Sequence, residues 1–256
     1  MEHEIVQAIR NNGFHLNYQP LITVENNRFT GFEALLRWRH PSQGMIGPHE
    51  FLPILESTGM ITEMGDWVLE TGCREILTCQ ASTDQLISLN VNVSMYQFNQ
   101  IDFPARVSSI LTKTGFNPTM LKLEITESCL VDDIELSRNT IKKLKKLGIQ
   151  IAVDDFGTGY SAFTYLRDFE LDCLKLDHSF IKDIPNDRYA EGICRALITM
   201  AKEMDLNVVA EGVENEMQLA WLKQEGVDEY QGELFSAPLS LEQTVSFLES
   251  GCLIAD

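Results

Sequence analysis

Eight polar residues stand at the ends of short apolar runs, and together they have the chemistry of a cation-binding site. Five are carboxylates, two are side-chain amides and one is a lysine: Glu33, Asn92, Glu124, Asp154, Asp155, Lys175, Glu211 and Gln231. Oxygen ligands without histidine or cysteine select hard cations such as Mg²⁺ or Mn²⁺ over zinc or copper. Carboxylates crowded together would also raise one another's pKa unless cations were bound.

A pair of such cations would suit phosphodiester hydrolysis, which requires an activated water and stabilisation of both the attacking and the leaving oxygen. Adjacent Asp154 and Asp155 are well placed to contact two ions, one of them bridging. The same residue types also suit a carboxylate–metal lyase of the enolase type, with Lys175 as the base. Residue types alone leave both reactions open.

The elements that must position these residues alternate between strand and helix, after two extended segments at 15–23 and 28–38. We expect strands at 86–93, 121–126, 149–153, 173–176, 207–210 and 229–234, and helices at 50–56, 67–77, 134–147, 189–203, 217–224 and 241–248. About eight strands in such a repeat predict an α/β fold closed into a (β/α)8 barrel, whose strand ends meet at one mouth. An open doubly wound sheet is the alternative, but no GxGxxG follows the first strand.

Length and composition favour a single domain over residues 1–256. The chain is 44% hydrophobic, which is enough for a large core. Its formal net charge of −18 does not favour binding to a phosphate backbone. It shows no basic leader followed by an apolar run and no long apolar segment. We therefore expect a cytoplasmic protein that binds neither nucleic acid nor membrane directly. The six cysteines lack zinc-site spacing and are expected to be reduced and mostly buried.

Seven segments resemble the motifs of the EAL domain family in order and spacing, over about residues 18–238. They are FEALLRWRHP (32–41), LNVNVS (89–94), LEITES (123–128), VDDFGTGYS (153–161), LKLD (174–177), AEGVE (210–214) and YQG (230–232). The resemblance implies a modified TIM barrel with an antiparallel first strand. It also implies hydrolysis of cyclic di-GMP (c-di-GMP) to linear pGpG with two divalent cations, Mg²⁺ or Mn²⁺, inhibition by Ca²⁺, and a homodimer.

The same resemblance assigns a role to each matching residue. One cation would be held by Glu33, Asn92, Glu124 and Asp154, and the second by Asp154, Asp155 and Glu211. Lys175 would hold and polarise the attacking water, and Glu33 and Glu211 join it as catalytic residues. The substrate contacts would be Gln19, Leu35, Arg37, Asn92, Asp155, Glu214 and Gln231. Glu127 would stabilise the loop that contains DFGTGYS.

Two positions depart from the family pattern without touching a proposed ligand. Ala162 follows DFGTGYS where a small polar residue is usual, and we expect little effect. Glu233 follows YQG where a large or aromatic residue is usual, which would alter how a guanine base is held. The alternative function is a catalytically silent c-di-GMP receptor. Because the ligand set is complete, the sequence favours an active enzyme.

Overall fold

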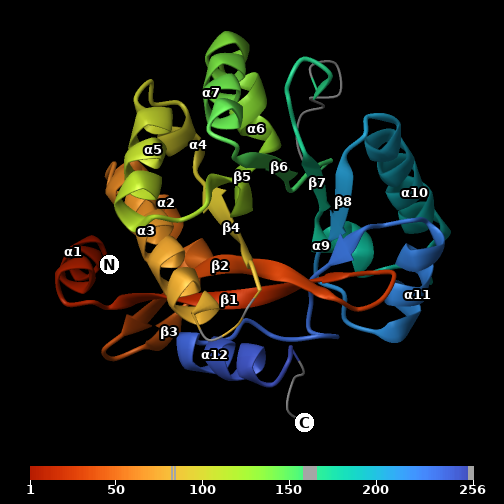
Figure 1. The fold of residues 1–256 in the computed structure, drawn as a ribbon, viewed down its shortest axis with the longest axis horizontal. Coiled ribbons are helices and arrows are strands. Elements are labelled where there is room, and N and C mark those ends of the chain that lie inside the picture. The colour runs from red at the N-terminus through yellow and green to blue at the C-terminus, as the bar shows by residue number, and fades with distance from the viewer. Residues whose placement is uncertain (82, 84, 158–165, 253–256) are drawn as a thin grey trace.

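The strands close into a barrel surrounded by helices (Figure 1), in a computed structural model that describes residues 1–81, 83, 85–157 and 166–252. The barrel strands are β1 (Phe14–Thr23), β2 (Phe29–His40), β4 (Ser88–Val93), β5 (Leu121–Thr126), β6 (Gln150–Asp154), β7 (Cys173–Leu176), β8 (Asn207–Ala210) and β9 (Glu229–Tyr230). From β2 to β9 neighbouring strands are parallel, whereas β1 is antiparallel to both β2 and β9. The α/β modified TIM barrel with an antiparallel first strand is confirmed.

The antiparallel hairpin of β1 and β2 closes the barrel. Its pairing runs from Phe14 opposite Trp38 to Ile22 opposite Phe29. The short strand β3 (Gly44–Ile46) pairs with the carboxyl-terminal end of β2, from Trp38 to His40. On the edge away from β1, β2 also approaches β4 so closely that a Cβ at Gly31 would lie 1.9 Å from Ser88 Oγ. Glycine at this position therefore permits the close approach of the two strands.

Helices cover the outside of the barrel (Figure 1). They are α1 (Glu2–Arg10), α2 (Pro48–Ser57), α3 (Ile61–Gln80), α4 (Met95–Phe98), α5 (Phe103–Thr114), α6 (Glu127–Val131), α7 (Ile134–Lys146), α9 (His178–Ile181), α10 (Arg188–Glu203), α11 (Glu216–Gln224) and α12 (Leu241–Glu249), with a 3₁₀ turn at Pro118–Met120. The last helix packs against the hairpin, where the Phe247 ring meets Phe29 and Phe32 edge-on. This contact ties the C-terminal helix to the start of the barrel.

The core has two parts, one on each side of the strands. The larger part fills the space between the strands and the helices. The smaller part lies inside the barrel and consists of Leu21, Ala152, Cys173 and Val209, here called the barrel floor. Because parallel strands are covered on both faces, β7 is buried along its whole length. The floor supports the polar residues that follow it along each strand.

The strand expected at 229–234 is shorter in the structure, where β9 contains only Glu229–Tyr230. After Tyr230 the chain pairs instead with the segment that follows β8, through Val213 N to Gln231 O and Leu234 N to Val213 O. A Cβ at Gly232 would lie 2.2 Å from Val213 O, so glycine is needed there. Backbone pairing across the mouth of the barrel thus ends the strand early.

The state of the cysteines agrees with the sequence analysis. All six cysteines are free, and five are buried. Within the described ranges, no helix has both the length and the apolar character needed to cross a membrane.

Candidate active site

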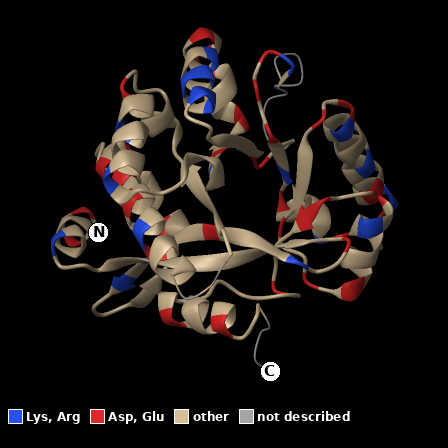
Figure 2. Ribbon diagram, viewed as in Figure 1, with Lys and Arg blue, Asp and Glu red and all other residues tan. Residues whose placement is uncertain are grey.

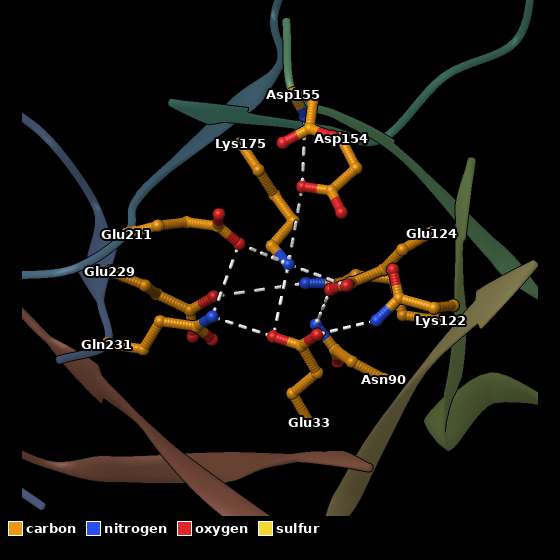
Figure 3. A network of polar contacts seen from close by, with 11 residues as sticks. Glu33, Asn90, Lys122, Glu124, Asp154, Asp155, Lys175, Glu211, Glu229 and Gln231 are labelled. Atoms are coloured by element: carbon orange, nitrogen blue, oxygen red, sulfur yellow. Dashed lines mark hydrogen bonds and ion pairs between the residues drawn. The ribbon is translucent and has the colours of Figure 1, made fainter. Parts of the chain in front are cut away.

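The eight polar residues gather at the mouth of the barrel; Figure 3 labels all of them except Asn92, which donates a hydrogen bond to Glu33. Five of them lie on strands: Glu33 on β2, Asn92 on β4, Glu124 on β5, Asp154 on β6 and Lys175 on β7. Asp155, Glu211 and Gln231 directly follow β6, β8 and β9. Residues far apart in the sequence meet here because the carboxyl ends of parallel barrel strands share one rim.

Lys175 lies at the centre of the cluster and has no exposed surface. Its Nζ is 2.5 Å from Glu211 Oε1, 2.6 Å from Glu124 Oε2, 3.2 Å from Glu33 Oε2 and 3.5 Å from Asp154 Oδ1. Burial lowers the pKa of Lys175, but Glu124, Glu211 and Glu33 outweigh it and raise that pKa well above the usual range. The surrounding carboxylates therefore favour the protonated form of Lys175.

Two side-chain amides hold the Glu33 carboxylate from either side. Asn92 Nδ2 donates to Glu33 Oε1 at 2.6 Å, and Gln231 Nε2 donates to Oε2 at 2.6 Å. Gln231 also donates to Glu211 Oε1 at 3.2 Å. Burial raises the pKa of Glu33, but the Lys175 charge and these donors lower it below its usual value overall. Glu33 is therefore ionised.

Glu124 and Glu211 are shifted in the opposite direction. Burial, followed by the charge of Glu33, raises the pKa of Glu124 well above its usual range despite Lys175. Burial also raises the pKa of Glu211 to about 8, with Lys175 opposing and Asp154 adding to the shift. Without cations, burial therefore favours the protonated forms of Glu124 and Glu211. Because metal ligands must be deprotonated, a bound cation would take the place of those protons.

Asp154, Asp155 and Glu211 form the group with the geometry of a metal site. Each offers one carboxylate oxygen, and these oxygens all lie within 4.8 Å of one another. The backbone of Asp155 is in the left-handed region, with φ of 52°, and its N–H donates to Asp154 Oδ1 at 3.0 Å. Burial and the charge of Asp154 raise the pKa of Asp155. These oxygen donors fit a hard divalent cation.

A second set shares Asp154 with the first and consists of Glu33, Glu124, Asp154 and Asn92. Its three carboxylates all contact Lys175. Asn92 turns its amide N–H toward Glu33, so rotation of the amide by half a turn would present its oxygen instead. The set then offers only oxygen atoms, which again fits Mg²⁺ or Mn²⁺.

Glu127 is the first residue of α6, beyond the end of strand β5. Its side chain is buried, and Oε2 accepts a hydrogen bond from Gly157 N at 3.4 Å. Glu127 therefore contacts the start of the DFGTGYS loop, which the sequence analysis expects it to stabilise. The rest of that loop, including Ala162, lies outside the described residues.

The other residues expected to contact substrate lie along β1 and β2 or follow β8. Gln19 is paired with Glu33 across the hairpin and donates to Ser236 O at 3.2 Å. Arg37 donates to Leu36 O at 3.0 Å, and partial burial lowers its pKa, although a guanidinium remains charged. Glu214 Oε1 lies 3.3 Å from His178 Nε2.

A mostly apolar cavity of about 340 Å³ adjoins the site next to Asn92 and Leu35. Its lining includes Leu52, Ile61, Met64 and Val68, with polar groups from Ser94, Gln97 and Thr126. Cavities of this size and lining commonly take small organic ligands. The polar mouth and the apolar cavity together form a site with one charged part and one apolar part.

Three polar residues inside the barrel were not singled out from the sequence. They are Asn90, Lys122 and Glu229, whose side chains lie among those of the cluster (Figure 3). Each precedes a predicted site residue by two positions, as Asn90 precedes Asn92. Since alternate residues of a strand share a face, this spacing is the signal that could have found them.

A barrel with an acidic, lysine-centred site at its carboxyl mouth has the architecture of barrel enzymes, whose active sites lie at that mouth. The chain belongs to the EAL domain family, whose profile matches residues 2–238.

Named relatives and solved structures agree with this assignment. The cyclic di-GMP phosphodiesterase NbdA of Pseudomonas aeruginosa is 39% identical over 98% of this chain, and PdeR of Escherichia coli, also named a cyclic di-GMP phosphodiesterase, is 34% identical over 91%. The chain spans about a third of the length of either relative, 32% and 35%. A structure described as the PaMucR phosphodiesterase in a c-di-GMP complex has a TM-score of 0.90 at 36% identity, covering 94% of this chain and 98% of that one.

Proposed function

We propose that this chain hydrolyses c-di-GMP to linear pGpG and so lowers the level of a second messenger. The observation that carries the proposal is the set of carboxylates and amides gathered around Lys175 at the mouth of an EAL barrel. Relatives named as cyclic di-GMP phosphodiesterases, and a neighbouring structure described with c-di-GMP bound, support the same substrate.

We propose two divalent cations, Mg²⁺ or Mn²⁺, as cofactors. The first would be held by Glu33, Asn92, Glu124 and Asp154, and the second by Asp154, Asp155 and Glu211. With all five carboxylates ionised, as cation ligation requires, and one ammonium, the cluster would carry four negative charges, which two divalent cations would neutralise. When bound, the cations would activate a water and stabilise the charge that develops on the phosphodiester.

The protein's own contribution centres on Lys175. Its ammonium would orient the attacking water and oppose the negative charge of the transition state. Glu33 and Glu211 keep that ammonium in place, and Gln231 donates to both of them. Because these groups are buried and mutually hydrogen-bonded, they would need little rearrangement during the reaction.

The substrate would lie between the polar mouth and the adjoining cavity. Arg37 is a local cation that would bind a phosphate in a bidentate manner. The cavity beside Leu35 would accept a purine base against its aliphatic lining. The remaining contacts would come from Gln19, Asn92, Asp155, Glu214 and Gln231, while Glu127 would hold the loop that begins at Gly157.

Incubation with c-di-GMP tests the proposed function. With Mg²⁺ or Mn²⁺, chromatography should show conversion to pGpG. Ca²⁺ should bind but support no more than about a hundredth of that rate, because its larger radius and looser geometry position water poorly. Bound but unchanged dinucleotide under all three ions would instead identify a receptor. No interaction at all would contradict both functions. The enolase-type alternative is disfavoured because the chain matches the EAL family over residues 2–238.

We also propose that the chain forms a homodimer through α10, beside the loop that follows Asp155. Tyr189 and Ile193, one turn apart on α10, are 84% and 48% exposed. A Cβ at Gly157 would lie 3.3 Å from Phe180 on the neighbouring helix and 3.5 Å from Leu197 on α10. Association at α10 would therefore act on the start of the loop beside Asp155.

The double variant Tyr189→Ser, Ile193→Asp should weaken the dimer at least about tenfold, since apolar area would no longer be buried. Sedimentation over a range of concentrations measures this, with Ile101→Asp as the control because Ile101 is 79% exposed on another part of the chain. Because coupling is reciprocal, c-di-GMP with Ca²⁺ should tighten the wild-type dimer. A dimer constant that neither the variant nor the dinucleotide changes would contradict the proposal.

A further inference from the structure

Asn90 is a buried polar residue whose side chain serves a neighbouring strand. It lies on β4 inside the barrel and is 1% exposed. Its Nδ2 donates to Glu124 Oε1 at 2.7 Å, and this is the one side-chain hydrogen bond of Asn90 among the described residues. Its Oδ1 meets no donor within that part of the chain. The bond to Glu124 is thus what fixes the orientation of this amide.

Strand register makes this bond specific. Asn90 is level with Glu33 on β2, and Asn92 is level with Glu124 on β5. The two amides nevertheless cross over, because Asn92 bonds to Glu33 and Asn90 bonds to Glu124. Each carboxylate is therefore held by an asparagine from a different layer of the barrel. Glu124 is held from below, on the side of the barrel floor.

Lys122 and Glu229, the other two polar residues of this part of the barrel, pair with each other, whereas Asn90 bonds to Glu124. Lys122 Nζ lies 3.8 Å from Glu229 Oε2, and Lys122 is also buried. The bond from Asn90 occupies Oε1 of Glu124, while Oε2 faces Lys175 at 2.6 Å. An amide N–H donates to a carboxylate oxygen, so this bond fixes the direction in which Glu124 holds its two oxygens.

We propose that Asn90 is a positioning residue for the cation site. Its N–H holds Glu124 Oε1 on the side of the barrel floor and thereby presents Oε2 toward the mouth. This inference rests on the proposed cation site but does not require that c-di-GMP be the substrate. An apolar residue of similar size at position 90 would fill the same space without orienting Glu124, which distinguishes positioning from packing.

Titration of the purified chain with Mn²⁺, followed by the electron paramagnetic resonance of the free ion, tests this role without an activity readout. Asn90→Leu should weaken Mn²⁺ binding at least about tenfold and lower kcat by about 10–100-fold, the usual effect of losing a group that orients a ligand. KM for c-di-GMP should stay within about threefold, because Asn90 does not contact the substrate site. Asn90→Ala, which removes volume, is the second variant if Asn90→Leu fails to fold.

Val91→Ala is the matched control, because Val91 is the next residue of β4, is 2% exposed and packs on the outer face. It should lower the melting temperature but leave Mn²⁺ affinity within about twofold, since its side chain faces away from Glu124. Unchanged Mn²⁺ affinity in folded Asn90 variants, or an equal loss in Val91→Ala, overturns the proposal. If the Asn90 variants bind Mn²⁺ more weakly than the wild type, and the wild type does not hydrolyse c-di-GMP, the role of Asn90 is supported and the proposed function is refuted. A wild type that binds no Mn²⁺ refutes both.

Discussion

Replacing Glu33 with alanine is expected to reduce c-di-GMP turnover at least about 10³-fold while the barrel stays folded. Glu33 links three neighbours, because it accepts hydrogen bonds from Asn92 and Gln231 and pairs with Lys175. Its loss would remove one oxygen ligand and would also release the amides that hold the mouth together. Folding should persist because Lys175 keeps its contacts with Glu124 and Glu211.

Steady-state rates with Mg²⁺ measure the expected loss of turnover, and thermal melting shows whether the barrel stays folded. Glu33→Gln preserves the shape of the side chain and should lose nearly as much activity, because an amide is a poor substitute for a charged ligand. Glu75→Gln is the control, since Glu75 is a partly buried glutamate that accepts a hydrogen bond from Tyr18 outside the cluster. Near-normal turnover in Glu33→Ala would refute the assignment of this site.

The barrel itself could be predicted because its signal is local to each strand. The ranges 121–126, 173–176 and 207–210 expected from the sequence coincide with β5, β7 and β8. Each is a short segment rich in leucine, isoleucine or valine, which is typical of a parallel strand covered on both faces. Convergence of the eight polar residues then follows from the parallel arrangement, without knowledge of any single contact.

The contacts within the site could not be predicted in this way. Sequence spacing places Asn90 and Asn92 on one face of β4, but it does not show that one reaches Glu124 and the other Glu33. That choice depends on strand tilt and register, which are properties of the closed barrel. Likewise, β9 ends early because Val213 pairs with Gln231, and nothing local to β9 indicates that pairing.

The electrostatics of the cluster connect its stability to its proposed activity. Lys175 is the cation that contacts the buried carboxylates in this structure, and burial still raises the pKa of Glu124 and Glu211. Burial of these carboxylates is therefore unfavourable without further positive charge, which divalent cations would supply. Cation binding should stabilise the fold as well as permit the reaction.

Lys175→Met is expected to lower kcat at least about 10³-fold while the affinity for c-di-GMP in Ca²⁺ changes by only a few-fold. The reason is that an ammonium aimed at the reacting water contributes mainly in the transition state. The structure adds a second expectation. Without divalent cations the variant should lose about 3–5 kcal/mol of stability, because the carboxylates around Lys175 would lose their counter-ion.

Single-turnover rates, c-di-GMP titration in Ca²⁺ and denaturant unfolding with and without Mg²⁺ together test the role of Lys175. Lys122→Met is the matched control, because Lys122 is the other buried lysine of the barrel interior and pairs with Glu229. It should keep kcat within about tenfold. Mg²⁺ should restore stability to Lys175→Met without restoring turnover, because a cation can replace the charge of Lys175 but cannot donate its hydrogen bonds. If affinity collapses while the rate from the bound state survives, Lys175 binds the phosphate and does not act on the water.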